Sequence, residues 1–164
     1  MMSDECKVYL LRRHQGELYG EALFGALGGS ATDAGQRKKW LVLAQLERQT
    51  KERIQSFLDR AEIAITEPNE STLKGAADAL RFAAVDWRDL MRGFRHELEG
   101  FVAEFRQAEN LDRSGSELDE LLRYITAHEE ALLQFVRREL AGGGEDSLEA
   151  VRRLLHHVHP GNPR

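Results

Sequence analysis

The chain has 164 residues, of which 41% are hydrophobic and 31% charged, and its formal net charge is −5. This length suits one domain with a substantial core. The acidic balance argues against a nucleic-acid binder, which usually carries a basic excess. The single cysteine excludes an internal disulfide framework, and no apolar run reaches the length of a membrane span.

The N-terminal segment MMSDECK lacks the basic region and apolar core of a signal peptide. We therefore expect a cytoplasmic protein. The chain has only three prolines and is rich in Ala, Leu, Glu and Arg, a mixture that is typical of a helical bundle.

Apolar periodicity and capping residues predict four long helices and two short ones. The expected ranges are about 3–27, 33–66, 71–84, 86–109, 116–141 and 147–158. Either Ser3 or Asp4 can cap the first of these helices, and either Ser114 or Ser116 the fifth. Pro68 marks the break after the second helix. Because residues 71–110 are helix-prone throughout, one continuous rod is the alternative to two helices there. On the predicted helix 71–84, the inward face is expected to hold four apolar residues, Leu73, Ala76, Ala77 and Leu80.

Each of the four long helices carries a glutamate near the middle of an otherwise apolar face, namely Glu17, Glu47, Glu97 and Glu129. At a rise of about 1.5 Å per residue, all four fall near one level of an antiparallel bundle. A buried carboxylate is costly unless another group pairs with it or a metal ion binds it. Four at one level therefore predict a shared partner.

Two histidines, His14 and His128, are expected near the same level on inward faces. Carboxylates combined with imidazoles suit metals such as iron and manganese. The structural alternatives are a core histidine satisfied by hydrogen bonds and, for Glu47, a hydrogen bond to Thr50 and to an arginine.

Three segments resemble helices of the ferritin-like, rubrerythrin-type four-helix bundle family: HQGELYGEALF (14–24), LERQTKERIQSF (46–57) and AHEEALLQFVRREL (127–140). The resemblance implies an all-α fold, a ferritin-like four-helix bundle over residues 1–141 with a short crossover helix. A Gly linker, a fifth helix and a tail would follow in residues 142–164. The family places a di-iron or di-manganese centre at mid-bundle, which implies oxygen or peroxide chemistry or iron handling. An enzyme of this kind would be a metal-dependent oxidoreductase.

The sequence departs from the family's Glu-x-x-His pattern twice, because Thr50 and Leu132 occupy the two expected histidine positions. The chain also lacks a rubredoxin-type Cys-x-x-Cys pair. The resemblance, adapted to the residues present, implies the following ligands: Glu17, Glu47, Glu97 and Glu129 as carboxylates, with His128 and His14 in place of the missing nitrogens. Three phenylalanines, Phe94, Phe101 and Phe105, are expected to keep the pocket apolar.

The alternative is a ferritin-like scaffold that has lost its metal and acts through a protein partner or by dimerisation. Its core polar residues would then form a hydrogen-bonded network. In both cases we expect a homo-oligomer, most simply a dimer, with no nucleic-acid or membrane partner. The sequence identifies neither catalytic residues nor a small-molecule substrate.

Overall fold

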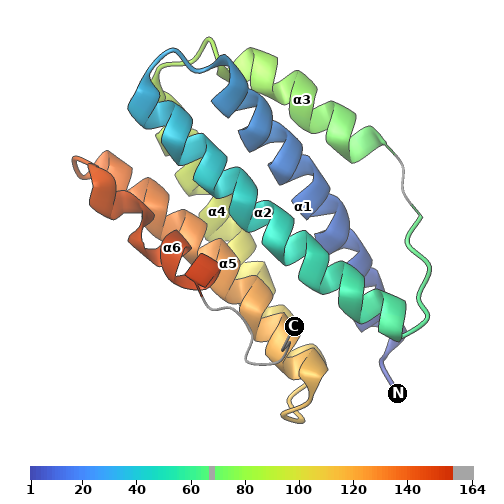
Figure 1. Cartoon of the computed structure of the whole chain (residues 1–164). Helices are drawn as coiled ribbons and strands as arrows, with labels where there is room; N and C mark the ends of the chain where they lie inside the picture. The colour runs from blue at the N-terminus through green and yellow to red at the C-terminus, as the bar shows by residue number, and fades with distance from the viewer. Residues whose placement is uncertain (67–68, 157–164) are drawn as a thin grey trace, which may run out of the picture.

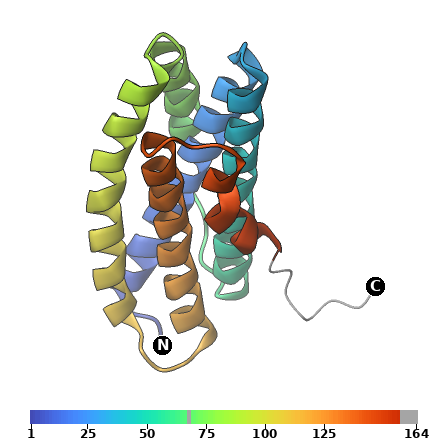
Figure 2. The same cartoon turned by 90° about the vertical axis from the view of Figure 1, so that its left-hand side faces the viewer.

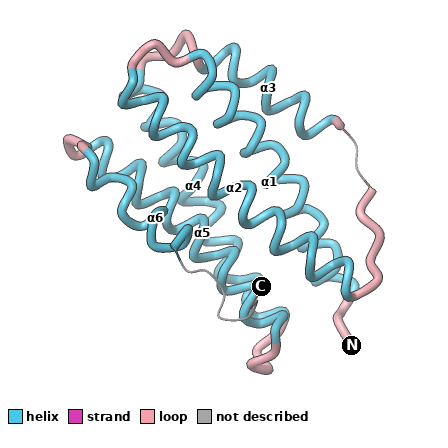
Figure 3. Tube along the Cα trace, in the orientation of Figure 1, coloured by secondary structure: helices cyan, strands magenta, loops and turns pink. Residues whose placement is uncertain are grey.

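The structure is a computed structural model that describes residues 1–66 and 69–156. Six α-helices account for most of these residues (Figure 3): α1 (Asp4–Ser30), α2 (Ala34–Arg60), α3 (Glu70–Phe82), α4 (Trp87–Ala108), α5 (Glu117–Leu140) and α6 (Glu149–His156). Two 3-10 turns, Glu109–Leu111 and Glu145–Leu148, precede α5 and α6. No strand occurs within the described ranges, so the predicted all-α class is confirmed.

The four long helices α1, α2, α4 and α5 lie side by side (Figures 1 and 2). The pair α1 and α2 is antiparallel, and so is the pair α4 and α5. Helix α3 runs along α1 on the outside of the molecule and returns the chain to the end from which α4 starts, so α2 and α4 run in the same direction. Helix α6 packs against α5 and α2.

The helix starts follow the capping residues in the sequence. The side chains of Ser3, Asp33 and Ser116 accept hydrogen bonds from backbone N–H groups in the first turns of α1, α2 and α5. Such caps satisfy donors that have no partner within the helix. The expected starts of these three helices are confirmed.

The predicted end of α2 at about residue 66 is wrong, because the helix ends at Arg60. Glu62 adopts a left-handed conformation with φ of 57°, and the N–H of Ile63 donates to the carbonyl of Leu58. This hydrogen bond closes the helix in a Schellman-type turn without the glycine that usually signals one. Pro68, the break expected from the sequence, lies outside the described residues.

Residues 71–110 form two helices rather than one rod, and Asp86 caps the second through the N–H of Arg88. The predicted inward face of α3 is also wrong, since Leu73 is 67% exposed and Leu80 is 80% exposed. Helix α3 instead docks on α1 through Gly75, where a Cβ atom would lie 2.4 Å from the carbonyl oxygen of Tyr19. The Tyr19 hydroxyl donates to Asp78 at 2.7 Å. Close backbone approach and a partly buried hydrogen bond thus decide which face of α3 turns inward.

The interior consists of two apolar clusters separated by a polar layer. The Trp40 cluster includes Leu23, Phe24, Leu43, Met91, Phe135 and Val151. The Ile54 cluster includes Cys6, Leu10, Leu58, Phe105 and Ile125. Along α1, α2 and α5, the chain passes from one cluster to the other through buried polar residues, and these form the polar layer: Glu17, Glu47, Thr50, His128 and Glu129.

Helix α6 covers part of the Trp40 cluster, with Leu148 before it and Val151 within it fully buried. The bundle itself therefore covers the apolar side of this helix; residues 157 and 158, the end of its predicted range, lie outside the described residues. In the described part of the chain, no helix has both the length and the apolar character needed to cross a membrane.

Candidate metal centre

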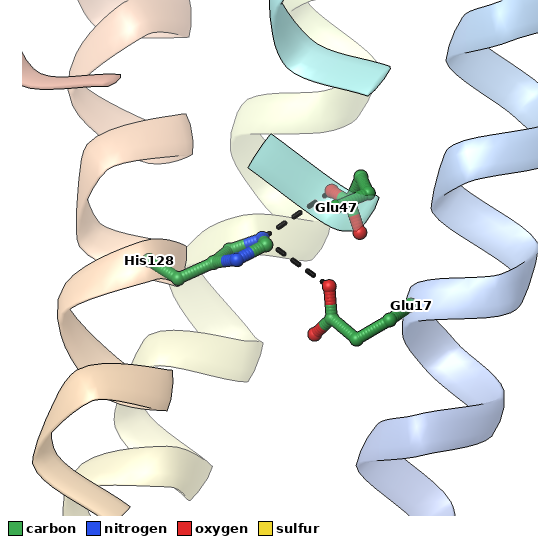
Figure 4. A group of neighbouring side chains, drawn as sticks. All are labelled: Glu17, Glu47 and His128. Carbon is green, nitrogen blue, oxygen red and sulfur yellow. Dashed lines mark hydrogen bonds and ion pairs between the residues drawn. The ribbon is translucent and has the colours of Figure 1, made fainter. Parts of the chain in front are cut away.

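Three side chains from three different helices converge in the polar layer: Glu17 of α1, Glu47 of α2 and His128 of α5 (Figure 4). All three are buried. The Nε2 atom of His128 lies 3.3 Å from Oε1 of Glu47 and 3.7 Å from Oε2 of Glu17. One oxygen or nitrogen from each residue lies within 4.8 Å of the others. The arrangement therefore presents two carboxyl groups and one imidazole to a common point.

Gly20 makes room for this cluster. It lies one turn after Glu17 on α1, and a Cβ atom at this position would lie 2.3 Å from Oε2 of Glu47. The Glu47 carboxyl can therefore reach toward α1 only past a glycine. Sequence reasoning missed Gly20 as part of the site. The available signal was a glycine in a helix interior, where it costs about 1 kcal/mol relative to alanine and needs a packing reason.

Thr50, at the first expected histidine position, does not enter the cluster but holds His128 in place. Its Oγ1 lies 2.6 Å from Nδ1 of His128, in a fully buried contact. The Thr50 hydroxyl can also donate to the Tyr124 hydroxyl at 3.4 Å, to which the Gln49 amide donates at 2.7 Å. The sequence offered no signal for Tyr124, because this support depends on how α5 is rotated against α2.

This contact is compatible with either tautomer of His128, so Nε2 can carry a proton or offer a lone pair. When Thr50 donates to Nδ1, Nε2 carries the proton and can donate to Glu47. When Nδ1–H donates to Thr50 and Thr50 donates onward to Tyr124, the lone pair of Nε2 faces the carboxyls. Metal-bound histidines are commonly oriented by such a hydrogen bond from the other ring nitrogen.

The carboxyl groups of the polar layer favour their protonated forms. Burial raises the pKa of Glu17 well above its usual value, although the His128 charge opposes the shift. Burial also raises the pKa of Glu47 to about 8, against the hydrogen bond that it accepts from Glu17. The pKa of Glu129 rises to about 7, again mainly through burial. A cation that binds here must displace protons, and it would compensate the buried negative charge.

A cavity of about 320 Å³ borders the cluster, and Glu17, Glu47 and Glu129 all line it. Arg13 lines it too. The Arg13 guanidinium lies over the Phe105 ring at 4.3 Å, and its positive charge partly offsets the raised pKa values of the three glutamates. Sequence reasoning missed Arg13, which stands beside rather than within the apolar periodicity of α1.

The six predicted ligands thus have different positions. Glu17, Glu47 and His128 converge, and Glu129 is buried at the adjoining cavity. Glu97 is exposed on α4 and lines the edge of the same cavity. His14 is buried, but its Nε2 lies 2.9 Å from the amide oxygen of Gln55, and it is not part of the converging group.

Two further expectations concern the walls of the site. Phe94 and Phe101 line the cavity as predicted, but Phe105 does not; it packs in the Ile54 cluster against Tyr9. Leu132, at the second expected histidine position, is buried and forms part of the apolar wall. The side of the cavity where the family pattern predicts a nitrogen ligand is therefore apolar in this chain.

The distances from His128 to the two carboxyl groups suit a single ion. Nitrogen and oxygen ligands lie about 2.0–2.2 Å from a metal such as zinc, so two ligand atoms on one ion are at most about 4.4 Å apart. The distances of 3.3 and 3.7 Å from Nε2 satisfy this limit. Oε2 of Glu17 is buried and has no hydrogen-bond partner among the described residues, so it is available as a ligand atom.

Comparisons of the chain with family models, with curated proteins and with solved structures find no match. The interpretation of this site therefore rests on its geometry and its chemistry.

Proposed function

We propose that this protein is a ferritin-like helical bundle that binds one divalent metal ion through Glu17, Glu47 and His128. The observation that carries the proposal is the convergence of these three buried donors from α1, α2 and α5. The order of the helices supports the ferritin-like topology in this proposal. Two antiparallel pairs are joined by one long crossover that contains α3, and bundles of this class have one such crossover.

Two carboxylates and one imidazole form a donor set for hard or borderline cations, among which we favour Fe²⁺ and Mn²⁺. Such an ion, when bound, acts as a Lewis acid and supplies electrons for oxygen or peroxide chemistry. The chain would contribute the rest. Thr50 orients His128, Glu129 can hold a proton at the cavity wall, and the apolar wall excludes water.

A dinuclear centre has weaker support than a mononuclear one. Beyond the converging group, the cavity offers Glu129 and the exposed Glu97 as carboxylates, while Leu132 provides no ligand. We therefore propose one ion per chain. A stoichiometry of two would show that Glu129 and Glu97 complete a second position when metal is present.

A metal-free scaffold is the second candidate, and one observation favours it. The carboxyls of Glu17 and Glu47 hydrogen-bond to each other, and His128 is held by Thr50, so much of the layer is satisfied without an ion. The dimer, the cytoplasmic location and the absence of nucleic-acid and membrane partners stay predictions.

Metal titration separates the two candidates. Protein purified without a tag and stripped with chelator should bind Fe²⁺ or Mn²⁺ one to one in anaerobic calorimetry, and elemental analysis should confirm the ratio. The variants Glu47→Gln and His128→Ala should each weaken binding at least about tenfold. The matched controls are Glu21→Gln, which removes a carboxylate paired with Arg48 and Lys51, and His96→Ala, which removes an exposed histidine. Both controls should bind as the wild type does. A wild-type protein that binds neither metal would overturn the metal proposal and leave the scaffold.

A further inference from the structure

The cavity beside the cluster is larger than oxygen chemistry alone requires. Its volume of about 320 Å³ is roughly ten times the space that one water molecule occupies in the liquid. Binding sites for small organic molecules start at about this size. A molecule such as O₂ or peroxide would leave most of the cavity unfilled.

One wall of the cavity is buried and apolar. It includes Leu23, Phe24, Leu43, Leu132, Phe135 and Val136. These side chains come from α1, α2 and α5, and they belong to the tightly packed Trp40 cluster. This wall is therefore preformed and suits the hydrocarbon part of a ligand.

The α4 side of the cavity is more open. Phe101 is 41% exposed, Leu98 is half-buried and Glu97 is exposed, and all three line the cavity. Lys74 of α3 lines it as well and is exposed. A ligand can therefore enter on the side where α4 faces α1 and α3, without disturbing the buried wall.

The polar end offers hydrogen-bond acceptors, because each carboxyl group keeps an accepting oxygen whether it is protonated or ionised. Glu17, Glu47 and Glu129 meet the cavity there, with Arg13 as the one cationic side chain among the buried or half-buried lining residues that the structure describes. An anionic head group would face three acidic groups against one guanidinium. A head group that donates a hydrogen bond, or carries a positive charge, finds complementary partners.

We propose that this cavity binds a small, mainly apolar molecule with one hydrogen-bond-donating head group, an aliphatic alcohol or amine. The head group lies at the Glu17, Glu47 and Glu129 end, and the hydrocarbon tail lies along the wall formed by Leu132, Phe135 and Val136. As a statement about the substrate of the metal site, this inference rests on the proposed function. Binding in the cavity itself does not require the ion.

The test uses three probes with the same hydrocarbon tail and different head groups: octan-1-ol, octylamine and octanoate. Each is titrated by calorimetry into the metal-free full-length chain at neutral pH. The alcohol and the amine should bind one to one, and octanoate should bind at least about tenfold more weakly. Glu129→Gln should reduce this discrimination. Equal binding of all three probes, or no binding of any, would overturn the proposal.

Two variants locate the ligand. Leu98→Trp adds volume from the half-buried α4 side and should weaken octan-1-ol binding by roughly tenfold. Leu80→Trp, the same substitution at a leucine that is 80% exposed on α3, is the matched control and should bind as the wild type does. Thermal melts check that both variants fold. Octan-1-ol binding that survives Leu98→Trp unchanged would place the ligand elsewhere and overturn the proposal.

Metal binding is titrated separately on the same preparations, so the two proposals fail independently. Metal binding without binding of the alcohol or amine would overturn only the ligand proposal. Binding of the alcohol and amine without metal binding would support the cavity ligand and overturn the metal centre.

Discussion

The polar layer and the two apolar clusters on either side of it occupy the same helices but do different work. In the Trp40 cluster, Trp40 stacks on Phe24 with ring centroids 5.6 Å apart and meets Trp87 edge-on at 5.0 Å. Such packing stabilises the fold directly. In the polar layer, Glu17 and Glu47 are about as buried as Trp40, yet burial opposes their ionised forms. The comparison teaches that stability comes from the clusters, whereas the layer is retained at a cost that a bound cation would offset.

We expect the largest loss of stability from a substitution in the apolar Trp40 cluster. Trp40→Ala should lower the free energy of unfolding by about 3–5 kcal/mol, because it removes a large buried ring and leaves a cavity. Urea denaturation followed by circular dichroism measures the change. The neighbouring Leu41 is 49% exposed, so Leu41→Ala should cost less than about 1 kcal/mol. Similar losses at the two positions would contradict the assignment of Trp40 to the core.

Gly20→Ala tests how tightly the polar layer is packed. The new methyl group would lie 2.3 Å from Oε2 of Glu47, so the carboxyl must move. We expect a loss of about 1–3 kcal/mol in urea denaturation and weaker metal binding. At Gly25, on the same helix, an added Cβ meets nothing within 4 Å. Gly25→Ala should therefore stabilise the protein by about 0.5–1 kcal/mol through helix propensity, and a gain at both positions would show that Glu47 adapts freely.

The pH dependence of stability should report the raised pKa values of the carboxyl groups in the polar layer. The pKa of Glu47 is about 8 in the folded chain and about 4.3 in an unfolded one. Between these values the folded state binds more protons than the unfolded state, so the stability of the metal-free protein should fall as pH rises from about 5 to 8. Glu47→Gln should flatten this slope and stabilise the metal-free protein at pH 8 by on the order of 1–3 kcal/mol.

Thermal melts of chelator-treated protein across this pH range provide the measurement. Glu52→Gln, which changes an exposed glutamate on the same helix, should leave the slope as it is. Added Fe²⁺ or Mn²⁺ should raise the melting temperature of the wild type at pH 8 but not that of Glu47→Gln. A stability that is flat between pH 5 and 8 would mean that the layer holds no such protons.

The smallest effect should come from the support of His128. Thr50→Val removes the hydroxyl that lies 2.6 Å from Nδ1, and we expect a loss of about 1–2 kcal/mol in stability together with roughly tenfold weaker metal binding. Thr126→Val is the control, because the buried Thr126 hydroxyl donates back to the carbonyl of Leu122 on its own helix. If both variants bind metal as the wild type does, Thr50 does not orient the histidine.

The sequence by itself determined the helices and much of the polar layer. The apolar periodicity of α1, α2 and α5 turns Glu17, Glu47 and His128 inward, and helix length alone brings them to one level. Capping residues marked where these three helices begin. Such properties depend on positions within one helix, and a single sequence contains them fully.

Only the tertiary structure decided how each helix is rotated about its own axis and how closely it approaches its neighbours. Glu97 is exposed at the edge of the cavity, and α3 turns Leu80 to solvent because Gly75 and Asp78 dock it on α1. A helix with apolar residues on more than one side leaves its rotation to the balance of packing against other helices. The role of Gly20 could not be predicted for a similar reason. Its missing side chain matters because Glu47 of another helix occupies the space where a Cβ atom would lie.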